Sequence, residues 1–555
     1  MTHFKEVFAN QYSLDKHGAY VIDKAHIQNA LHVLKHDDGY HFLVDMTAID
    51  YLTCKEHSLE RFAIIYLLRD RHFKNLITLK TYIDSSLATQ SVVSLFKAAN
   101  WAEREIWDQY GISFKNHPNL KRVLNHKEFI GHPLRKDYPI TQGQLCHRTD
   151  DLMDEMTPRL KKRGLDKEEG LMFLNLGPAH PASHGTIRTF VALDGESISC
   201  AVSEIGYLHR GFEKSCENHT YNQIIPYTDR LNYCSAILNN IGFAHAVEGI
   251  LGVDLPKRAK FIRVIIGELS RIIDHLVCLA AILVDMGALT NYWYLYNPRE
   301  VAYDLLSKLT GARLTNAYMR IGGMSHDLYD GFENDLNACI KAVETGVGDT
   351  LRLIEHNRIF HDRTQNVGII TKEEAINRGF SGPNLRACGV PYDLRVNEPY
   401  YHYESFDFDI AVGSVGDVYD RMMVRFEEIR QSIRIIKQAM HRLPSGDICV
   451  KDAAISFPSK TNVYSNIEGL MNQFKLVYEG VKVPPKEYYR AIEAGNGELG
   501  FFIISDGSGT PYKVKVRPPC FYAMAAYPSI IEGGMIADAI LTLGSLNIIA
   551  GELDR

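Results

Sequence analysis

The sequence lacks paired cysteines. It holds ten cysteines among 555 residues, and no two of them stand in a CxxC pair. Zinc ribbons, thiol redox motifs and iron–sulfur sites use such pairs, so the spacing argues against a site of these kinds built by this chain alone. Scattered single cysteines are typical of buried thiols in a reducing compartment.

Long hydrophobic runs are also missing. The first residues, Met1-Thr-His-Phe-Lys-Glu-Val, contain no apolar run, so a secretory signal is not expected. The most apolar stretch, residues 276–284, is far too short to cross a bilayer. We therefore expect a soluble, cytoplasmic chain, which could still sit on a membrane protein.

Neither sign of charge dominates. The formal net charge is −6, which gives no indication of binding to nucleic acid or to an anionic membrane surface. With 46% hydrophobic and 23% charged residues, the composition is that of an ordinary globular protein. The length allows more than one domain, and the sequence contains no internal repeat or low-complexity segment.

The sequence pattern of residues 1–140 predicts an α/β domain. A helix is predicted over 91–110, where Val92, Leu95, Phe96, Ala99, Ile106 and Trp107 follow helical spacing and Gly111 can end it. Strands are predicted from the apolar runs at 41–45, 62–68 and 76–82. Residues 141–168 are polar, and we interpret them as a linker between domains.

Residues 169–555 form the second predicted domain, and long helical patterns dominate it. The clearest patterns lie at 256–287 and 415–441. Strand-like runs return near the end, at 500–504 and 512–516. The expected fold class is therefore α+β, with an α/β domain followed by a mainly helical domain.

Two histidines share one unusual segment, Gly177-Pro-Ala-His180-Pro-Ala-Ser-His184-Gly185. Prolines and glycines forbid an ordinary helix there, so the imidazoles stand on a shaped turn. Alternating runs on both sides of Asp194-Gly195 predict a β-hairpin directly after it. The pair could bind a metal, bind a quinone or other substrate, or be structural. Metal is the least favoured, because no third ligand is apparent.

Asp285 and a polar–aromatic cluster are further candidates. Asp285 ends a strongly apolar helical pattern, where a carboxylate either faces solvent, as is usual, or is buried and paired. The cluster contains Tyr227, Asp229, Arg230 and Tyr233. A tyrosine hydroxyl can protonate a carbonyl that is being reduced, although a core tyrosine with a satisfied hydroxyl is the commoner situation.

Longer motifs carry a family resemblance. Residues 103–118 (Glu-Arg-Glu-Ile-Trp-Asp-Gln-Tyr-Gly onwards) and 131–139 (Gly-His-Pro-Leu-Arg-Lys-Asp-Tyr-Pro) resemble the 30-kDa-type subunit of respiratory complex I. The histidine segment and residues 207–214, 416–421, 505–507 and 551–555 resemble the 49-kDa-type subunit. In this order, over nearly the whole chain, the sequence resembles the fused C–D subunit of bacterial NADH:quinone oxidoreductase.

The resemblance implies a site and a fold. His184 and Tyr233 would hydrogen-bond the quinone head group, Asp285 would pair with His184, and His180 would line the same cavity. Arg210 and Arg230 would lie toward the terminal iron–sulfur cluster of a neighbouring subunit. The C-terminal domain would be similar to the large subunit of nickel–iron hydrogenases, with β-sheet additions.

The resemblance also implies a setting. The chain would bind no cofactor alone and would take quinone as substrate. Its partners would be other complex I subunits, including those of the membrane arm, at the cytoplasmic side of the bacterial inner membrane. At position 315 the family often has histidine, where this chain has Thr315. The resemblance associates that histidine with a pH-dependent potential of the adjacent iron–sulfur cluster. Threonine does not titrate, so we expect the potential of this cluster to depend weakly on pH, as would suit a low-potential quinone such as menaquinone.

Of three alternatives, the sequence argues against the first two and leaves the third open. A nickel–iron hydrogenase needs two CxxC pairs, but Cys216 and Cys520 stand alone in the corresponding regions. A purely structural connector would explain the missing cofactor motif, but a polar triad that faces an apolar helix argues against it. A related quinone-reducing complex with a donor other than NADH would use the same chain, since the donor site would lie on other subunits.

Overall fold

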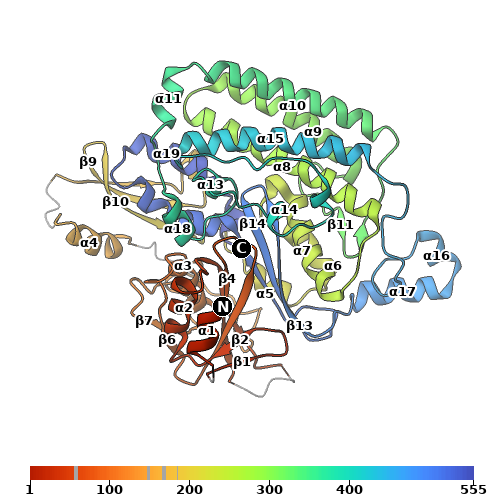
Figure 1. The fold of residues 1–555 in the computed structure, drawn as a ribbon, viewed down its shortest axis with the longest axis horizontal. Helices are drawn as coiled ribbons and strands as arrows, with labels where there is room; N and C mark the ends of the chain where they lie inside the picture. Colours follow the sequence, from red (N-terminus) through yellow and green to blue (C-terminus); the bar gives the residue numbers. More distant parts are fainter. Residues whose placement is uncertain (10, 55–59, 147–150, 166–169, 184) are drawn as a thin grey trace. The chain divides into compact units, whose positions relative to one another are not determined.

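A computed structural model describes residues 1–9, 11–54, 60–146, 151–165, 170–183 and 185–555. The chain forms two compact units, and both combine helices with sheets, which confirms the predicted α+β class (Figure 1). Unit 1 contains Met1–Lys214, Val367–Phe380 and Pro519–Arg555, and unit 2 contains Ser215–Asn366 and Ser381–Pro518. The predicted division into 1–140, 141–168 and 169–555 stays a prediction.

Unit 1 is built around a five-stranded sheet. Its order is β1 (Tyr12–Leu14), β2 (Tyr20–Ile22), β5 (Leu76–Ile83), β4 (Phe62–Arg69) and β3 (Phe42–Asp50). All neighbours are antiparallel except the parallel pair β2–β5. The three strands predicted from apolar runs are confirmed. Every residue of β3 and β4 is buried, as continuous apolar strands require.

Helix α3 (Ala99–Tyr110) begins eight residues later than predicted. Residues 88–90 form strand β6, and the segment after it makes one separate turn, where the Val92 N–H donates to Oε1 of Glu103 at 2.7 Å. Val92 and Phe96 of this turn are buried, so the apolar spacing resembles that of a helix although these residues do not belong to α3. The predicted end at Gly111 is confirmed, because its φ of 76° is left-handed.

A three-stranded antiparallel sheet follows in unit 1. Its order is β10 (Ser197–Glu204), β9 (Arg188–Asp194) and β8 (Met172–Leu176), which confirms the hairpin around Asp194-Gly195. The interval interpreted as a polar linker contains helix α4 (Met153–Lys162). Met156 and Leu160 are buried in a cluster with side chains of β9 and β10. The helix was not predicted because most residues of this interval are polar and only a few apolar side chains form its buried face.

The end of the chain completes unit 1. It forms helices α18 (Pro519–Ile531), α19 (Ile536–Leu546) and α20 (Ala550–Leu553), of which α18 packs against α3, β10, α19 and α20. Arg555 donates from Nη2 to Oε2 of Glu105 at 2.7 Å, and both side chains are almost fully buried. The terminal motif and the α3 motif, which carry two halves of the family resemblance, therefore meet in one buried ion pair.

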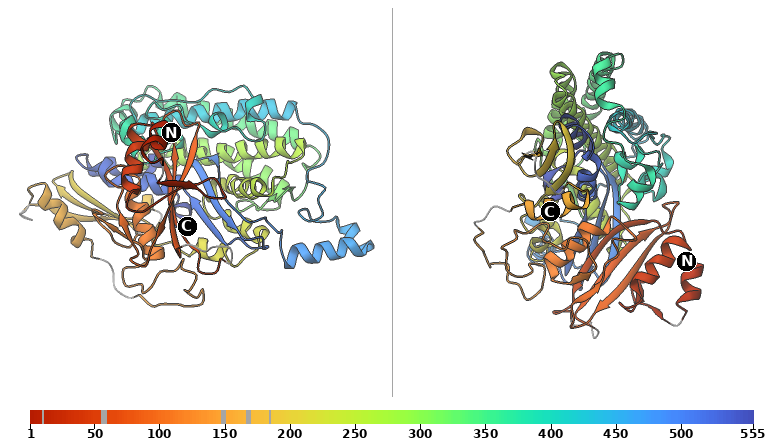
Figure 2. Two further views of the ribbon diagram at one scale, coloured as in Figure 1. Left: turned by 60° about the horizontal axis from the view of Figure 1, so that its bottom comes forward. Right: turned by 90° about the vertical axis from the view of Figure 1, so that its left-hand side faces the viewer.

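Unit 2 is a bundle of long helices beside a small sheet (Figures 1 and 2). The helices predicted at 256–287 and 415–441 are confirmed as α8 (Lys257–Asp285) and α15 (Val418–His441). Helix α8 packs against α15, α7 (Ala236–Leu251) and α9 (Leu289–Thr310). The other long helix, α10 (Phe332–Ile354), packs on α9.

The sheet of unit 2 has three antiparallel strands, β13 (Lys486–Ala494), β14 (Gly497–Ser505) and β15 (Lys513–Arg517). The runs at 500–504 and 512–516 are confirmed as strands, whereas β13 was not predicted. Helix α7 packs on β13. A Cβ atom at Gly249 of α7 would lie 2.7 Å from the Tyr488 ring, so glycine allows this close approach.

The remaining elements are short. They are α1 (Thr2–Val7), α2 (Ile27–His36), β7 (Ser113–Lys115), α5 (Phe212–Cys216), α6 (Tyr221–Thr228), β11 (Met319–Arg320), β12 (Gly323–Met324), α11 (Arg358–Thr364), α12 (Lys372–Asn377), α13 (Gly382–Arg386), α14 (Leu394–Asn397), α16 (Lys460–Ser465) and α17 (Ile467–Tyr478), with 3-10 turns η1 (Pro181–Ser183), η2 (Tyr233–Ser235) and η3 (Tyr403–Ser405).

Across the described ranges, every helix is too short or too polar to span a bilayer. All ten cysteines are free, and seven of them are buried, as expected for scattered thiols. Cys54, Cys146 and Cys449 are partly exposed.

Truncation of Met156 to alanine tests whether α4 is a packed element. We expect Met156→Ala to destabilise the docking of α4 by about 2–5 kcal/mol, the usual cost of a cavity at a fully buried site. Native-state proteolysis within 151–165 should then be at least ten-fold faster. Lys162→Ala, at an exposed position of the same helix, is the control. Equal cleavage of both variants would mean that α4 is only loosely attached.

Candidate functional site

The histidine segment connects strands β8 and β9 of unit 1. It is a shaped turn, as predicted: the Ser183 hydroxyl donates to the carbonyls of Pro178 (3.0 Å) and His180 (2.8 Å). The Ala182 N–H donates to Nδ1 of His180 at 3.2 Å, which orients this half-buried imidazole. A Cβ at Gly177 would lie 2.2 Å from the Ile187 carbonyl oxygen, so the turn closes tightly. His184 lies outside the described residues.

Tyr233 opens the turn η2 in unit 2, and 37% of the residue is exposed. Burial raises the pKa of its phenol to about 12, and Cys234 and Asp274 add to this effect. The group is therefore protonated at neutral pH. A protonated phenol that is partly open to solvent can donate to a bound carbonyl oxygen.

Asp274 fixes this turn, and the sequence analysis missed its role. Its buried Oδ2 accepts hydrogen bonds from Asn232 Nδ2 (2.7 Å) and Ser235 Oγ (2.8 Å), the residues on either side of Tyr233-Cys234. The backbone of Gly495 packs against the same oxygen, since a Cβ there would lie 2.1 Å away. The sequence offered one signal for this role, which is that Asp274 is a carboxylate within the apolar pattern of α8.

Asp285 is the last residue of α8, and its side chain is exposed. It lies eleven residues beyond Asp274, which corresponds to about 16 Å along the helix axis at 1.5 Å per residue. Helix α8 therefore carries both Asp285 and the anchor of Tyr233, at separate positions. The choice between a solvent-facing and a paired Asp285 depends on His184 and stays untested.

Arg210 lies on a loop of unit 1 that the end of the chain holds in place. Oδ1 and Oδ2 of Asp554 accept the N–H groups of Gly206 (3.0 Å) and Leu208 (2.9 Å). A Cβ at Gly206 would lie 2.3 Å from a backbone carbonyl oxygen, and its φ is 105°, so the loop requires glycine there. The Arg210 side chain is exposed.

Arg230 is half exposed in unit 2 and lies 3.6 Å from the buried carboxylate of Asp229. Burial raises the pKa of Asp229 to about 6, although a hydrogen bond from Asn240 (2.7 Å) and the charge of Arg230 oppose this rise. Asp229 also accepts the N–H of Ala317 at 3.4 Å. The predicted polar cluster thus joins the loop that carries Thr315. Tyr227 points elsewhere, toward His219 (3.4 Å).

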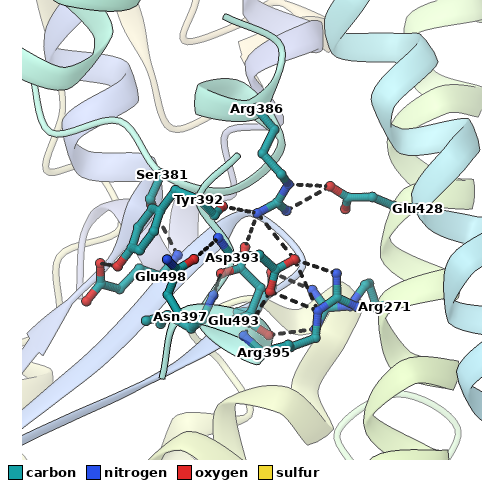
Figure 3. Close-up of polar contacts among 12 residues, drawn as sticks. Arg271, Ser381, Arg386, Tyr392, Asp393, Arg395, Asn397, Glu428, Glu493 and Glu498 are labelled. Atoms are coloured by element: carbon teal, nitrogen blue, oxygen red, sulfur yellow. Dashed lines mark hydrogen bonds and ion pairs between the residues drawn. The ribbon is translucent and has the colours of Figure 1, made fainter. Parts of the chain in front are cut away.

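Unit 2 also contains a buried arginine cluster (Figure 3). We define it as three arginines and four carboxylates joined by ion pairs: Arg271, Arg386, Arg395, Glu268, Asp393, Glu428 and Glu493. None of these side chains is more than 2% exposed. Arg386 is the centre: it donates to Glu428 and Glu493, each at 2.8 Å.

Helix α8 enters the cluster through successive turns. Glu268 accepts from the hydroxyls of Tyr403 (2.6 Å) and Ser432 (2.7 Å), and Arg271 donates to the carbonyl of Ala494 (2.8 Å). His275 lies 2.8 Å from Glu428, and burial lowers the pKa of the imidazole despite this carboxylate. The same helix that carries Asp285 is therefore tied to η3, α15 and β13.

Over the described ranges, no group of three or more His, Cys, Asp or Glu side chains is arranged to hold a metal ion.

Comparisons with known proteins agree with the motifs. The model of the family described as respiratory-chain NADH dehydrogenase, 49 Kd subunit, matches residues 285–555, and that of the 30 Kd subunit matches residues 20–144. The C/D subunit of NADH-quinone oxidoreductase from Bdellovibrio bacteriovorus is 46% identical over 94% of this chain and 92% of its own length. The chain belongs to this C/D family.

Relatives of the later part alone are also similar. The D subunit of NADH-quinone oxidoreductase from Myxococcus xanthus is 51% identical over 69% of this chain and 92% of its own length. The D 1 subunit of the oxidoreductase from Sorangium cellulosum is 49% identical over 73% of this chain and its whole length. The predicted fusion of a 30-kDa-type and a 49-kDa-type part is confirmed.

Replacement of Glu268 by glutamine tests the arginine cluster. Burial would raise the pKa of Glu268, but Arg271, Arg395 and two hydroxyl donors outweigh it and lower the pKa to about 2. This value lies below the unfolded one of about 4.3, so the carboxylate stabilises the fold fully above pH 4.3, and this contribution is lost as the pH falls toward 2.

We expect Glu268→Gln to lower the free energy of unfolding at pH 7 by about 3–5 kcal/mol, because two buried arginines lose a charged partner. Its stability should also change less than that of the native chain between pH 5 and pH 2. Urea unfolding across this pH range measures both effects. Glu344→Gln, which removes an exposed surface pair with Lys437, should stay within about 0.5 kcal/mol. Equal losses in the two variants would contradict the assignment.

Proposed function

We propose that the chain is a peripheral-arm subunit of proton-translocating NADH:quinone oxidoreductase. In this proposal it forms the quinone-reduction chamber with a neighbouring subunit that carries the terminal iron–sulfur cluster. Membership of the C/D family supports the assembly. The observation that carries the chemistry is Tyr233, a protonated and partly exposed phenol on a turn anchored by buried Asp274.

The chemistry requires two protons. A quinone that takes up two electrons from the neighbouring cluster also takes up one proton at each of its two oxygens. Tyr233 would donate the hydroxyl proton to one oxygen and His184 an imidazole proton to the other. Because the pKa of Tyr233 is high, the tyrosinate left behind is a strong base and is rapidly reprotonated. His180 would line the same cavity.

Asp285 would hold the charge and orientation of His184. Loss of this ion pair when the quinone is reduced would start the conformational change that drives proton pumping in the membrane arm. The continuity of α8 supports such a link, because one rigid helix carries Asp285, the anchor of Tyr233 and the arginine cluster.

The remaining parts of the proposal concern the surroundings. Arg210 and Arg230 would lie toward the partner's cluster, where permanent positive charge stabilises the reduced form and raises its potential. The chain would bind no cofactor of its own and would lie peripherally at the cytoplasmic side of the bacterial inner membrane. Its C-terminal domain would be related to the nickel–iron hydrogenase large subunit.

Removal of a proton donor tests the site. In the assembled complex, we expect Tyr233→Phe and His184→Ala each to lower NADH:quinone turnover about 100-fold or more, the usual contribution of a positioned proton donor. Tyr227→Phe is the matched control, because Tyr227 belongs to the same segment and is equally exposed at 38%. Unchanged turnover and quinone affinity in Tyr233→Phe or His184→Ala would mean that the site is wrongly assigned.

Introduction of a titratable group tests the role of position 315. Thr315 is half-buried, and we expect the native cluster potential to depend weakly on pH. Thr315→His should steepen the slope toward about 59 mV per pH unit, the value for one proton per electron. Redox titration of the complex followed by electron paramagnetic resonance measures this slope. Thr345→His, at an exposed position of α10, should leave it unchanged. A steep slope in the native complex would refute the prediction.

A further inference from the structure

Helix α17 exposes an apolar surface in unit 2. Together with α16 it forms a hairpin that projects from the helix bundle of that unit (Figures 1 and 2). We define the α17 stripe as its exposed apolar residues: Ile467, Leu470, Met471, Phe474, Val477 and Tyr478. Tyr464 of α16, which is 88% exposed, extends the stripe. Isolated exposed apolar residues are ordinary, but seven within fifteen positions are not.

The stripe follows the period of the helix. From Ile467 its members stand at i, i+3, i+4, i+7, i+10 and i+11, which places them on one face about 120° wide. The opposite face contains Gly469 and Leu476, the two buried residues of the helix. Helix α17 therefore already has a packed face, and the stripe is a second apolar face that the described part of the chain leaves exposed.

The hairpin is a built structure. The Asn466 N–H donates to the carbonyl of Asn462 (3.0 Å) at the end of α16, and its side chain accepts the N–H of Glu468 (3.0 Å) to cap α17. A Cβ at Gly469 would lie 2.5 Å from the Asn462 carbonyl oxygen, so glycine lets the two helices touch. The rings of Phe474 and Tyr478 stack at 5.6 Å. The stripe is thus held in a fixed geometry, which reduces the entropic cost of binding.

The stripe is large enough for a specific interface. Tyr464, Phe474 and Tyr478 are 88%, 66% and 78% exposed. At 150–250 Å² per aromatic side chain, these three alone present roughly 350–580 Å². One partner contributes about 800 Å² to a standard interface, so the rings supply about half of it before the aliphatic residues are added.

Charge identifies the kind of occupant. Glu468 and Lys475 are the only charged residues of α17, so its net charge is zero. A helix that lies on a membrane carries a polar face rich in lysine and arginine, which α17 lacks. Anchors at i, i+3, i+4 and i+7 are instead the pattern of a helix that binds in an apolar groove of another protein.

We propose that the α17 stripe docks into an apolar groove on another subunit of the same oxidoreductase complex. This rests on the proposed function, which places the chain in a multisubunit assembly. The groove would be lined with aliphatic side chains that receive Phe474 and Tyr478 as central anchors.

The test uses the native complex purified through a tag on this chain. A photoreactive benzoylphenylalanine at Met471 should crosslink to one other subunit of that complex. Phe474→Asp should lower the recovery of that subunit at least ten-fold, because a carboxylate is desolvated in the groove. Ile359→Asp is the matched control, since Ile359 is also exposed on a helix of unit 2, at 70%, but belongs to no stripe. The Ile359→Asp variant should recover as much of the crosslinked subunit as the native chain does.

Other results would overturn the proposal. Crosslinks only to lipid, or binding of the purified chain to phosphatidylethanolamine–phosphatidylglycerol vesicles that Phe474→Asp abolishes, would identify a membrane site. Crosslinks to a second copy of this chain would identify a self-interface. A complex recovered intact from Phe474→Asp without any crosslink would show that the stripe has no protein partner there. If the tagged native chain recovers no other subunit, the proposed function itself fails.

Discussion

Ion pairs between fully buried arginines and carboxylates hold the helical unit together, and four of the participating or adjoining side chains belong to α8. Glu268, Arg271, Asp274 and His275 point to different elements: Glu268 to η3 and α15, Arg271 to β13, Asp274 to η2, and His275 to α15. Each contact alone would fix one neighbour. Together these contacts fix α8 relative to the other elements of unit 2. The Tyr233 turn, which is bonded to α8, and Asp285, which ends α8, are therefore held on a rigid helix.

This arrangement has an energetic condition. A buried charge is tolerated only when partners surround it, and removal of one member leaves the others uncompensated. The cluster contains three arginines and four carboxylates, so its charges do not cancel. Burial raises the pKa of Glu493, as does the neighbouring Asp393, while Arg386 opposes the rise. The extra carboxylate therefore disfavours the charged form of Glu493, which the Arg386 guanidinium supports, and the members of the cluster depend on each other.

Local patterns predicted the elements better than the contacts between them. The hairpin around Asp194-Gly195 and the full length of α8 were predicted, because turn chemistry and helical period are encoded in neighbouring residues. The predicted start of α3 was wrong, because the residues before it form a separate turn whose apolar spacing resembles that of a helix. Glu103 accepts the Val92 N–H of this turn. Arg386 and Glu493 are 107 residues apart, and no local period marks such a pair. Tyr233 was predicted as a site residue from the polar–aromatic cluster and the family resemblance, whereas Asp274, which positions it, had only the weak signal of a carboxylate in an apolar run.

The pair between Glu105 and Arg555 joins positions 450 residues apart, and both belong to the first compact unit. Unit 1 therefore cannot complete its folding when its N-terminal sheet leaves the ribosome, because Arg555 is synthesised only after the whole helical unit. Because Glu105 and Arg555 belong to one polypeptide, their ion pair forms intramolecularly, at an effective concentration set by the chain itself. If the two parts were separate proteins, the same ion pair would depend on their cellular concentrations. Here the two parts are produced in equal number, and their meeting does not weaken on dilution.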